Sequence, residues 1–161
     1  MRSPQFPHAV LSRGFGSTWL LIGVSFWLLV LPASAWGQTV SLQVQVIYAA
    51  NQPGGVDSRL GNLAENLQKT FRYSMYQLLD APKGSAPLNQ TWRAALPDSR
   101  SLEITPTAIQ AGQYSLTVHV HEAGGKSLVN TVVRLRRGST VLVGGGPPYQ
   151  KGVLIIAVTA N

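Results

Sequence analysis

Residues 113–136 read QYSLTVHVHEAGGKSLVNTVVRLR, and this stretch decides the fold class. Apolar and polar residues alternate on both sides of Gly124-Gly125, which is the pattern of two half-buried strands joined by a tight turn. Slipping the pairing by one residue would turn the core side chains toward solvent, so the pattern predicts an antiparallel hairpin with one register. With a two-residue turn, the paired core positions are Val120 with Val129, Val118 with Thr131, Leu116 with Val133 and Tyr114 with Leu135.

Further strands lie on both sides of this hairpin. Thr39–Tyr48 alternates in the same way, and Val153–Val158 is apolar at every position. Continuous apolarity indicates burial on both faces, so we expect Val153–Val158 to be a central strand between a helix and a second sheet. Shorter strands are predicted at Tyr73–Leu79, Trp92–Leu96, Ser101–Thr105 and Ser139–Val143.

One helix is predicted after the first strand. Asp57 or Ser58 can cap its first turn, because a short oxygen-bearing side chain accepts hydrogen bonds from free amides there. Apolar residues then recur at steps of three and four, which indicates one buried stripe on a helix of about four turns. The stripe consists of Leu60, Leu63, Ala64, Leu67 and Phe71. The predicted fold is therefore a single α+β domain, rich in β-structure. We expect about seven or eight mostly antiparallel strands in one or two sheets, with this one amphipathic helix.

The first 35 residues have the order of a secretory signal peptide. Two arginines precede a charge-free apolar run at 19–31, and Ala33-Ser34-Ala35 offers the small residues that signal peptidase accepts. An uncleaved membrane anchor is the alternative, but a helix of that length rises only about 20 Å, less than the hydrocarbon core. We therefore predict cleavage after residue 35, a mature domain at 36–161 and no stable transmembrane segment after cleavage. The predicted location is periplasmic or secreted.

Composition excludes several classes of protein. The chain has 45% hydrophobic and 12% charged residues, which argues against disorder. It has no cysteine, so it forms no disulfide or thiolate metal site and uses no cysteine nucleophile. The net charge is +7, and it falls to +5 once Arg2 and Arg13 are removed with the signal segment. We expect no nucleic-acid partner, because the domain is predicted to be exported.

The densest basic cluster lies on the second strand of the hairpin. Arg134 and Arg136 share its outer face by strand alternation, and paired guanidinium groups bind phosphate or carboxylate groups well. The alternative is a charged face that keeps the sheet soluble and discourages edge pairing. If these arginines bind a partner, we expect an envelope protein or a polyanionic envelope component.

A glycine-rich loop follows this strand. Gly144-Gly145-Gly146 resembles a phosphate-binding loop in composition only, because Pro147-Pro148 lack amide donors and a strand rather than a helix follows. A structural turn is therefore the favoured interpretation. Because glycines also let a partner's backbone approach closely, we include this loop and Tyr149 among the candidate binding residues.

Two histidines provide the basis of an alternative function. His119 and His121 lie two residues apart on a strand, so both side chains point the same way and could contribute to a zinc or copper site. Such a site needs three or four ligands, and the third histidine of the chain lies in the signal segment. Solvent-facing histidines are therefore the favoured interpretation. A small-ligand or metal binder is nevertheless the alternative function, and an envelope hydrolase is a third.

The C-terminal part carries a resemblance to known proteins. Residues 140–158 read TVLVGGGPPYQKGVLIIAV and resemble the tail of a group of small exported bacterial proteins with a Gly-Gly-Pro turn before an apolar strand. Val56–Leu60 and Phe71–Leu79 resemble the same group. This chain departs from the pattern with three glycines and two prolines. The resemblance implies an exported bacterial domain and no particular activity.

No catalytic constellation accompanies these features. The sequence has no nucleophile elbow, no Ser-His-Asp set at a recognisable spacing and no paired carboxylates. We therefore predict a non-enzymatic binding or assembly component of the bacterial envelope, and we expect it to need no cofactor.

Overall fold

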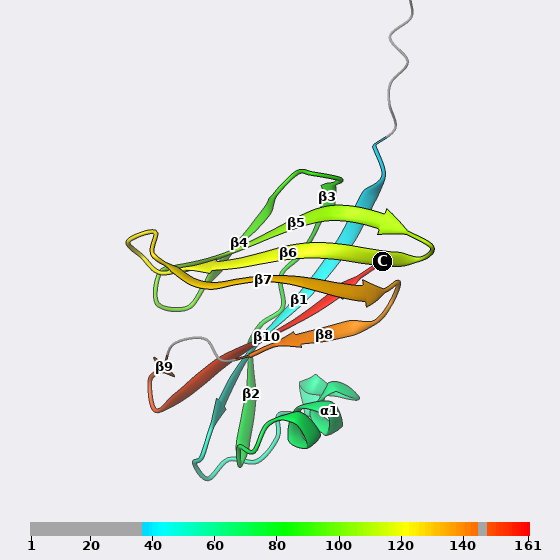
Figure 1. Cartoon of the computed structure of the whole chain (residues 1–161). Helices are drawn as coiled ribbons and strands as arrows, with labels where there is room; N and C mark the ends of the chain where they lie inside the picture. Colours follow the sequence, from blue (N-terminus) through cyan, green and yellow to red (C-terminus); the bar gives the residue numbers. More distant parts are fainter. Residues whose placement is uncertain (1–36, 145–147) are drawn as a thin grey trace, which may run out of the picture. The chain divides into compact units, whose positions relative to one another are not determined.

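The computed structural model describes residues 37–144 and 148–161, and these residues form two antiparallel sheets and one α-helix (Figure 1). The predicted signal segment lies outside the described residues, as do Gly145 and Gly146. The larger sheet contains β1 (Thr39–Ala50), β2 (Met75–Asp80), β3 (Lys83–Pro87), β8 (Thr140–Val143), β9 (Pro148–Tyr149) and β10 (Gly152–Ala160). The smaller sheet contains β4 (Trp92–Leu96), β5 (Arg100–Gln110), β6 (Gln113–His121) and β7 (Ser127–Arg136), in that order. The β-rich α+β class is therefore confirmed, and the described residues hold ten strands instead of seven or eight.

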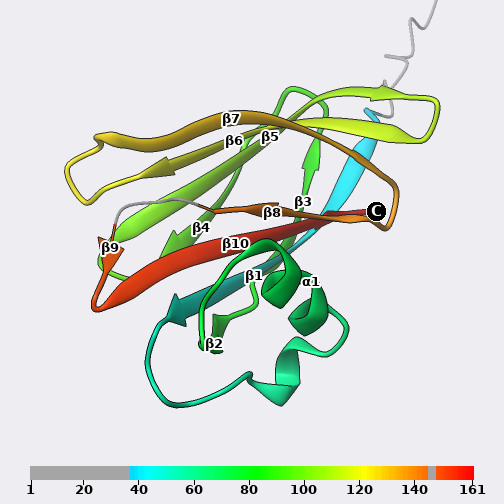
Figure 2. The same ribbon diagram turned by 60° about the horizontal axis from the view of Figure 1, so that its bottom comes forward.

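β1 and β10 form the centre of the larger sheet. They pair with each other over eight positions. On its other edge, β1 pairs with β2 and β3. On its other edge, β10 pairs with β8 and β9. On β10, Leu154 and Ile156 face the smaller sheet, whereas Ile155 and Ala157 face the helix. Figure 2 shows this order of layers, with β4–β7 on one side of β10 and α1 on the other. The prediction of a central strand covered on both faces is confirmed.

The hairpin of β6 and β7 has the predicted register. Val120 lies opposite Val129, and the pairing continues as predicted to Tyr114 opposite Leu135. The predicted two-residue turn is wrong. Glu122 N–H donates to the carbonyl of Lys126, and Gly125 closes a three-residue loop with a φ of 80°. A bulge next to His121 restores the register that the longer loop would otherwise displace.

The helical segment is shorter than predicted. Asp57 caps a single 3-10 turn, η1 (Ser58–Leu60), by accepting a hydrogen bond from Arg59 N–H. Gly61 then adopts a φ of 50°, which ends that turn, and α1 (Leu63–Thr70) begins beyond it. The predicted apolar stripe is buried at Leu60, Leu63 and Leu67 against the outer face of the larger sheet. In the described residues no helix is long and apolar enough to cross a bilayer.

Two strands were not predicted. β3 uses Lys83 and Gly84, which resemble turn residues in the sequence, and it pairs with the first half of β1. A side chain at position 84 would collide with the indole of Trp92, so the glycine lets the two sheets approach there. β9 is a two-residue strand and pairs with the start of β10.

Candidate functional site

The outer face of the smaller sheet carries two rows of polar or small side chains that cross β5, β6 and β7. On β6, Ser115 pairs with one residue of β5 and one residue of β7. Gln113, two residues before it, also pairs with one residue of each neighbouring strand. The rows are Ala108–Ser115–Arg134 and Gln110–Gln113–Arg136. Each row therefore ends in an arginine on β7, and the two arginines predicted to share an outer face do so.

A bulge in β5 creates this arrangement. Thr107 is the extra residue, so Pro106 pairs with Leu116 while Ala108 pairs with Ser115. One inserted residue exchanges the two faces of a strand. Ala108 therefore joins the outer face, although regular alternation from Pro106 would turn it inward. The Thr107 hydroxyl fixes the bulge by donating to the carbonyl of Ser115 at 3.2 Å.

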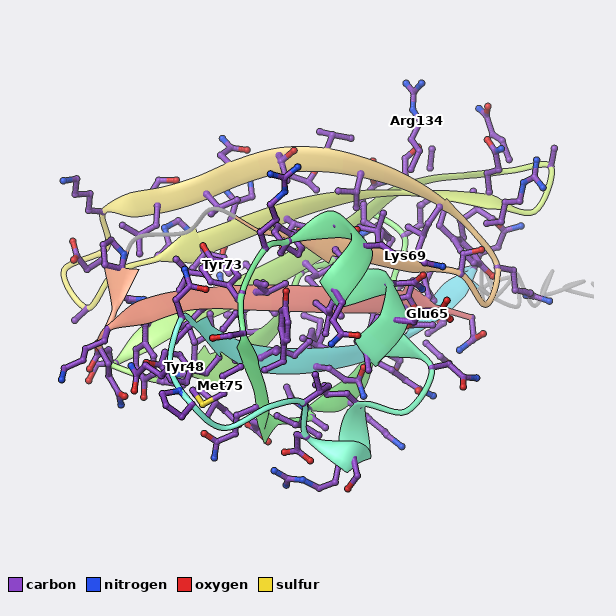
Figure 3. All side chains as sticks on the ribbon, turned by 90° about the horizontal axis from the view of Figure 1, so that it is seen from below. Tyr48, Glu65, Lys69, Tyr73, Met75 and Arg134 are labelled. Carbon is purple, nitrogen blue, oxygen red and sulfur yellow. The ribbon has the colours of Figure 1, made fainter. Side chains whose placement is uncertain are left out.

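The rows enclose an open groove of about 330 Å³. Ala108 and Ser115 form the bottom of the groove with their short side chains, and Arg134 lies at its edge. Figure 3 shows Arg134 projecting away from the sheet. The described residues that line the groove are Ala108, Gln110, Gln113, Ser115 and Arg134. The groove therefore combines a positive charge, two amides and a hydroxyl.

Neither arginine is neutralised within the described part of the chain. Arg134 and Arg136 are exposed and take part in none of the ion pairs or side-chain hydrogen bonds found there. The neighbouring Arg137 differs, because its Nε donates to the Tyr114 hydroxyl at 2.8 Å. β6 and β7 contain no aspartate or glutamate. This end of the face is therefore an uncompensated positive patch.

The histidines lie at the other end of the same face. His119 follows Ser115 by four positions along β6, which corresponds to about 13 Å. The two imidazole rings stack with their centroids 5.8 Å apart, and His121 Nε2 lies 3.6 Å from Glu103. Arg93 already donates to Glu103 at 2.7 Å, and this hydrogen bond is the main reason why the pKa of Glu103 is below its ordinary value.

This cluster gives little basis for a metal centre. Among residues 37–144 and 148–161, no group of three or more potential ligands is arranged to hold a metal ion. The neighbouring carboxylate of Glu103 is held by a guanidinium instead. The His119 and His121 pair therefore contributes a partly exposed polar surface, and the metal-binding alternative gains no third ligand.

The glycine-rich loop and the arginines are not brought together. Gly144 lies against the ring of Phe71, where an added Cβ would come within 2.6 Å of ring carbons. Tyr149 contacts Tyr48 edge-to-face, with ring centroids 5.6 Å apart. Both residues belong to the larger sheet and its packing, whereas Arg134 and Arg136 project from the outer face of the smaller one. Gly145 and Gly146 lie outside the described residues.

The sequence analysis missed four groove residues, which are Ala108, Gln110, Gln113 and Ser115. The available signal was Pro106, directly after the predicted strand Ser101–Thr105, because a proline within a strand that continued past Thr105 would indicate an edge or a bulge. Pro106 would have indicated a break in β5, but it would not have identified the residues that lie in the same row as Arg134.

No protein-family model, curated protein or solved structure matches this chain. The predicted resemblance to small exported bacterial proteins accordingly stays a prediction.

Proposed function

We propose that this chain is an exported, non-enzymatic binding domain of the bacterial envelope, and that it holds a polyanionic envelope component in the groove beside Arg134. The observation that carries the proposal is the pair of exposed arginines, which have no carboxylate partner among the described residues and lie next to amide and hydroxyl side chains in a recess. The predicted signal peptide supports an envelope location, and the predicted mature charge of +5 favours an acidic partner.

The spacing of the arginines suits a polymer. Residues two apart on a strand are separated by about 7 Å, so Arg134 and Arg136 can each bind one anionic group of the same chain. A guanidinium binds carboxylate or phosphate oxygens through two parallel hydrogen bonds. Gln110, Gln113 and Ser115 supply further donors and acceptors for neutral parts of the ligand.

A purely solubilising role explains less of the structure. Charged side chains on a strand discourage unwanted edge pairing, and Arg134 would serve that purpose on a flat face. Here a β-bulge turns Ala108 outward and leaves a recess between the rows, which solubility does not require. Because bulges commonly re-aim side chains near functional sites, the recess favours binding.

The test is a titration with two soluble polyanions, inorganic polyphosphate and a polyuronate, at low and moderate salt. We expect saturable binding that weakens with salt, as exposed charge pairs do. Arg134→Ser with Arg136→Ser should weaken it about 30-fold, since two exposed ion pairs of about 1 kcal/mol each are lost. The matched control is Lys126→Ser with Lys151→Ser, which removes the same charge from exposed loops. Equal affinities of the arginine and lysine variants for both polymers would contradict the proposal.

A further inference from the structure

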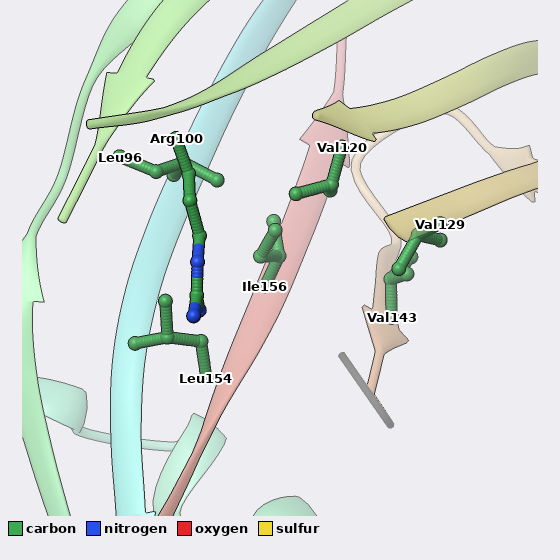
Figure 4. Close-up of a pocket in the computed structure, with 7 residues that line it drawn as sticks. All are labelled: Leu96, Arg100, Val120, Val129, Val143, Leu154 and Ile156. Atoms are coloured by element: carbon green, nitrogen blue, oxygen red, sulfur yellow. The ribbon is translucent and has the colours of Figure 1, made fainter. Parts of the chain in front are cut away.

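A second candidate site lies between the two sheets, at one end of the sandwich. Arg100 begins β5 and shares its inward face with Leu102 and Ile104, so strand alternation points the guanidinium into the core. Its side chain is 8% exposed, and it is the one buried charged residue of the described chain. Figure 4 shows the side chain running from β5 toward Leu154 of β10, with Val120 and Ile156 beside it.

The guanidinium of Arg100 is incompletely paired. Nη2 donates to the carbonyl of Pro148 at 3.0 Å, and Asp98 Oδ2 lies at 3.8 Å on a side chain that is 61% exposed. Nε is fully buried and has no hydrogen-bond partner in the described structure. A buried charge normally has a close counter-ion and satisfied donors, because its desolvation is costly. In the described structure, the Nε donor of Arg100 therefore has no acceptor, and its positive charge has no close counter-ion.

The guanidinium faces a small apolar cavity. The free volume is about 20 Å³, which is room for one oxygen-sized atom. Apart from Arg100, every described residue that lines it is aliphatic. These residues are Leu96, Val120, Val129, Val143, Leu154 and Ile156.

A groove between the sheet edges lies next to the cavity. Val129 of β7 and Val143 of β8 line both spaces, so these two side chains lie between the cavity and the groove. The groove has a volume of about 240 Å³. Its remaining lining is Thr131, Val133, Leu142 and Gly144, so the side chains that line it are mainly aliphatic. Together the spaces have a positive inner end and an outer part with mainly aliphatic side chains.

We propose that this cleft binds the carboxylate end of an unbranched alkyl chain. One carboxylate oxygen occupies the cavity and accepts the hydrogen bond from Arg100 Nε, and the alkyl chain lies in the groove between β7 and β8. A single water fits the cavity and accepts the same hydrogen bond, but it does not neutralise the charge.

Calorimetric titration of the purified protein with acetate, hexanoate, decanoate and decan-1-ol tests the proposal. We expect decanoate to bind at one saturable site, about tenfold more tightly than hexanoate, because four further methylene groups become half buried. Decan-1-ol should bind at least tenfold more weakly than decanoate, because it lacks the charge. Equal affinities for acetate and decanoate, or no saturable decanoate binding below about 1 mM, would overturn the proposal.

Two variants separate this site from the polyanion groove. Arg100→Met should reduce decanoate affinity at least tenfold and leave polyphosphate binding unchanged. Arg134→Ser should leave decanoate affinity unchanged, because Arg134 lies on the opposite face of the smaller sheet. Unchanged decanoate affinity in Arg100→Met would overturn the assignment. If that variant does not fold, the series of ligands on the unaltered protein still decides.

Discussion

Replacing Arg100 with methionine should stabilise the unliganded protein. Methionine is unbranched and similar in length, so it can follow the same path between the sheets, and it carries no charge into the core. The substitution removes the buried Nε that has no acceptor in the described structure. A residue retained for binding at the expense of stability should behave in this way.

The size of the effect follows from the contacts of Arg100. The variant loses one hydrogen bond from a charged donor to the Pro148 carbonyl, worth about 1.5–3 kcal/mol. It also loses a 3.8 Å ion pair with an exposed aspartate, worth at most about 1 kcal/mol. Against these losses stand the unpaired Nε, about 1–3 kcal/mol, and several kcal/mol for a desolvated guanidinium. We expect a net gain of about 1–2 kcal/mol, or about 4 °C in Tm for each kcal/mol.

Urea unfolding at pH 7, followed by tryptophan fluorescence and circular dichroism, measures this change. Coincident transitions by the two probes would justify a two-state free energy. Arg93→Met is the matched control, because that arginine is 71% exposed and its loss should change stability by less than about 1 kcal/mol. If Arg100→Met lowers the free energy of unfolding by more than about 1 kcal/mol, Arg100 is a structural residue and the reasoning is refuted.

Two further predictions concern the larger sheet and the helical segment. Gly152→Ala should destabilise the protein by roughly 1–3 kcal/mol, because the added Cβ would overlap the carbonyl oxygen of Ala49 within the β1–β10 pairing. Urea unfolding measures this change, and an unchanged midpoint would contradict the close packing at Gly152. The pKa of Asp57 is well below its ordinary value because its carboxylate accepts hydrogen bonds from the Arg59 side chain, the Arg59 amide and the Leu78 amide. Its contribution to stability is therefore full above the ordinary carboxyl pKa of 3.8 and is lost as the pH falls below that value. Asp57→Asn should flatten the acid side of the stability curve measured from pH 7 to pH 2, and parallel curves for the two proteins would be inconsistent with this role.

Local patterns in the sequence were sufficient for much of the fold. The β6–β7 register follows from alternation alone, because one pairing keeps the predicted core positions of both strands on the buried face. The central position of β10 follows from its uninterrupted apolar run. The helix was predicted too long because periodicity does not reveal the positive φ of Gly61, which separates η1 from α1.

The candidate sites could be predicted from the sequence only in part. The outer-face position of Arg134 follows from strand alternation, but its groove depends on the Thr107 bulge, whose place is fixed by pairing with another strand. Arg100 was overlooked because it follows the turn at Pro97–Ser99 and resembles a turn residue. Its alternation with Leu102 and Ile104 would have placed it inward. The structure was needed to show that its Nε has no hydrogen-bond partner among the described residues.

The central claim is that the arginine face of the smaller sheet binds an envelope component. The most direct measurement is co-purification of the tagged protein from gently crosslinked native envelopes. It should be carried out in parallel with the variant that has serine at Arg134 and Arg136 and with the lysine control. We expect the unaltered protein and the control to retain a stoichiometric anionic partner, and the arginine variant to lose it while remaining folded. Recovery of the unaltered protein as a monomer without a partner, or equal capture by the arginine variant, would contradict the account.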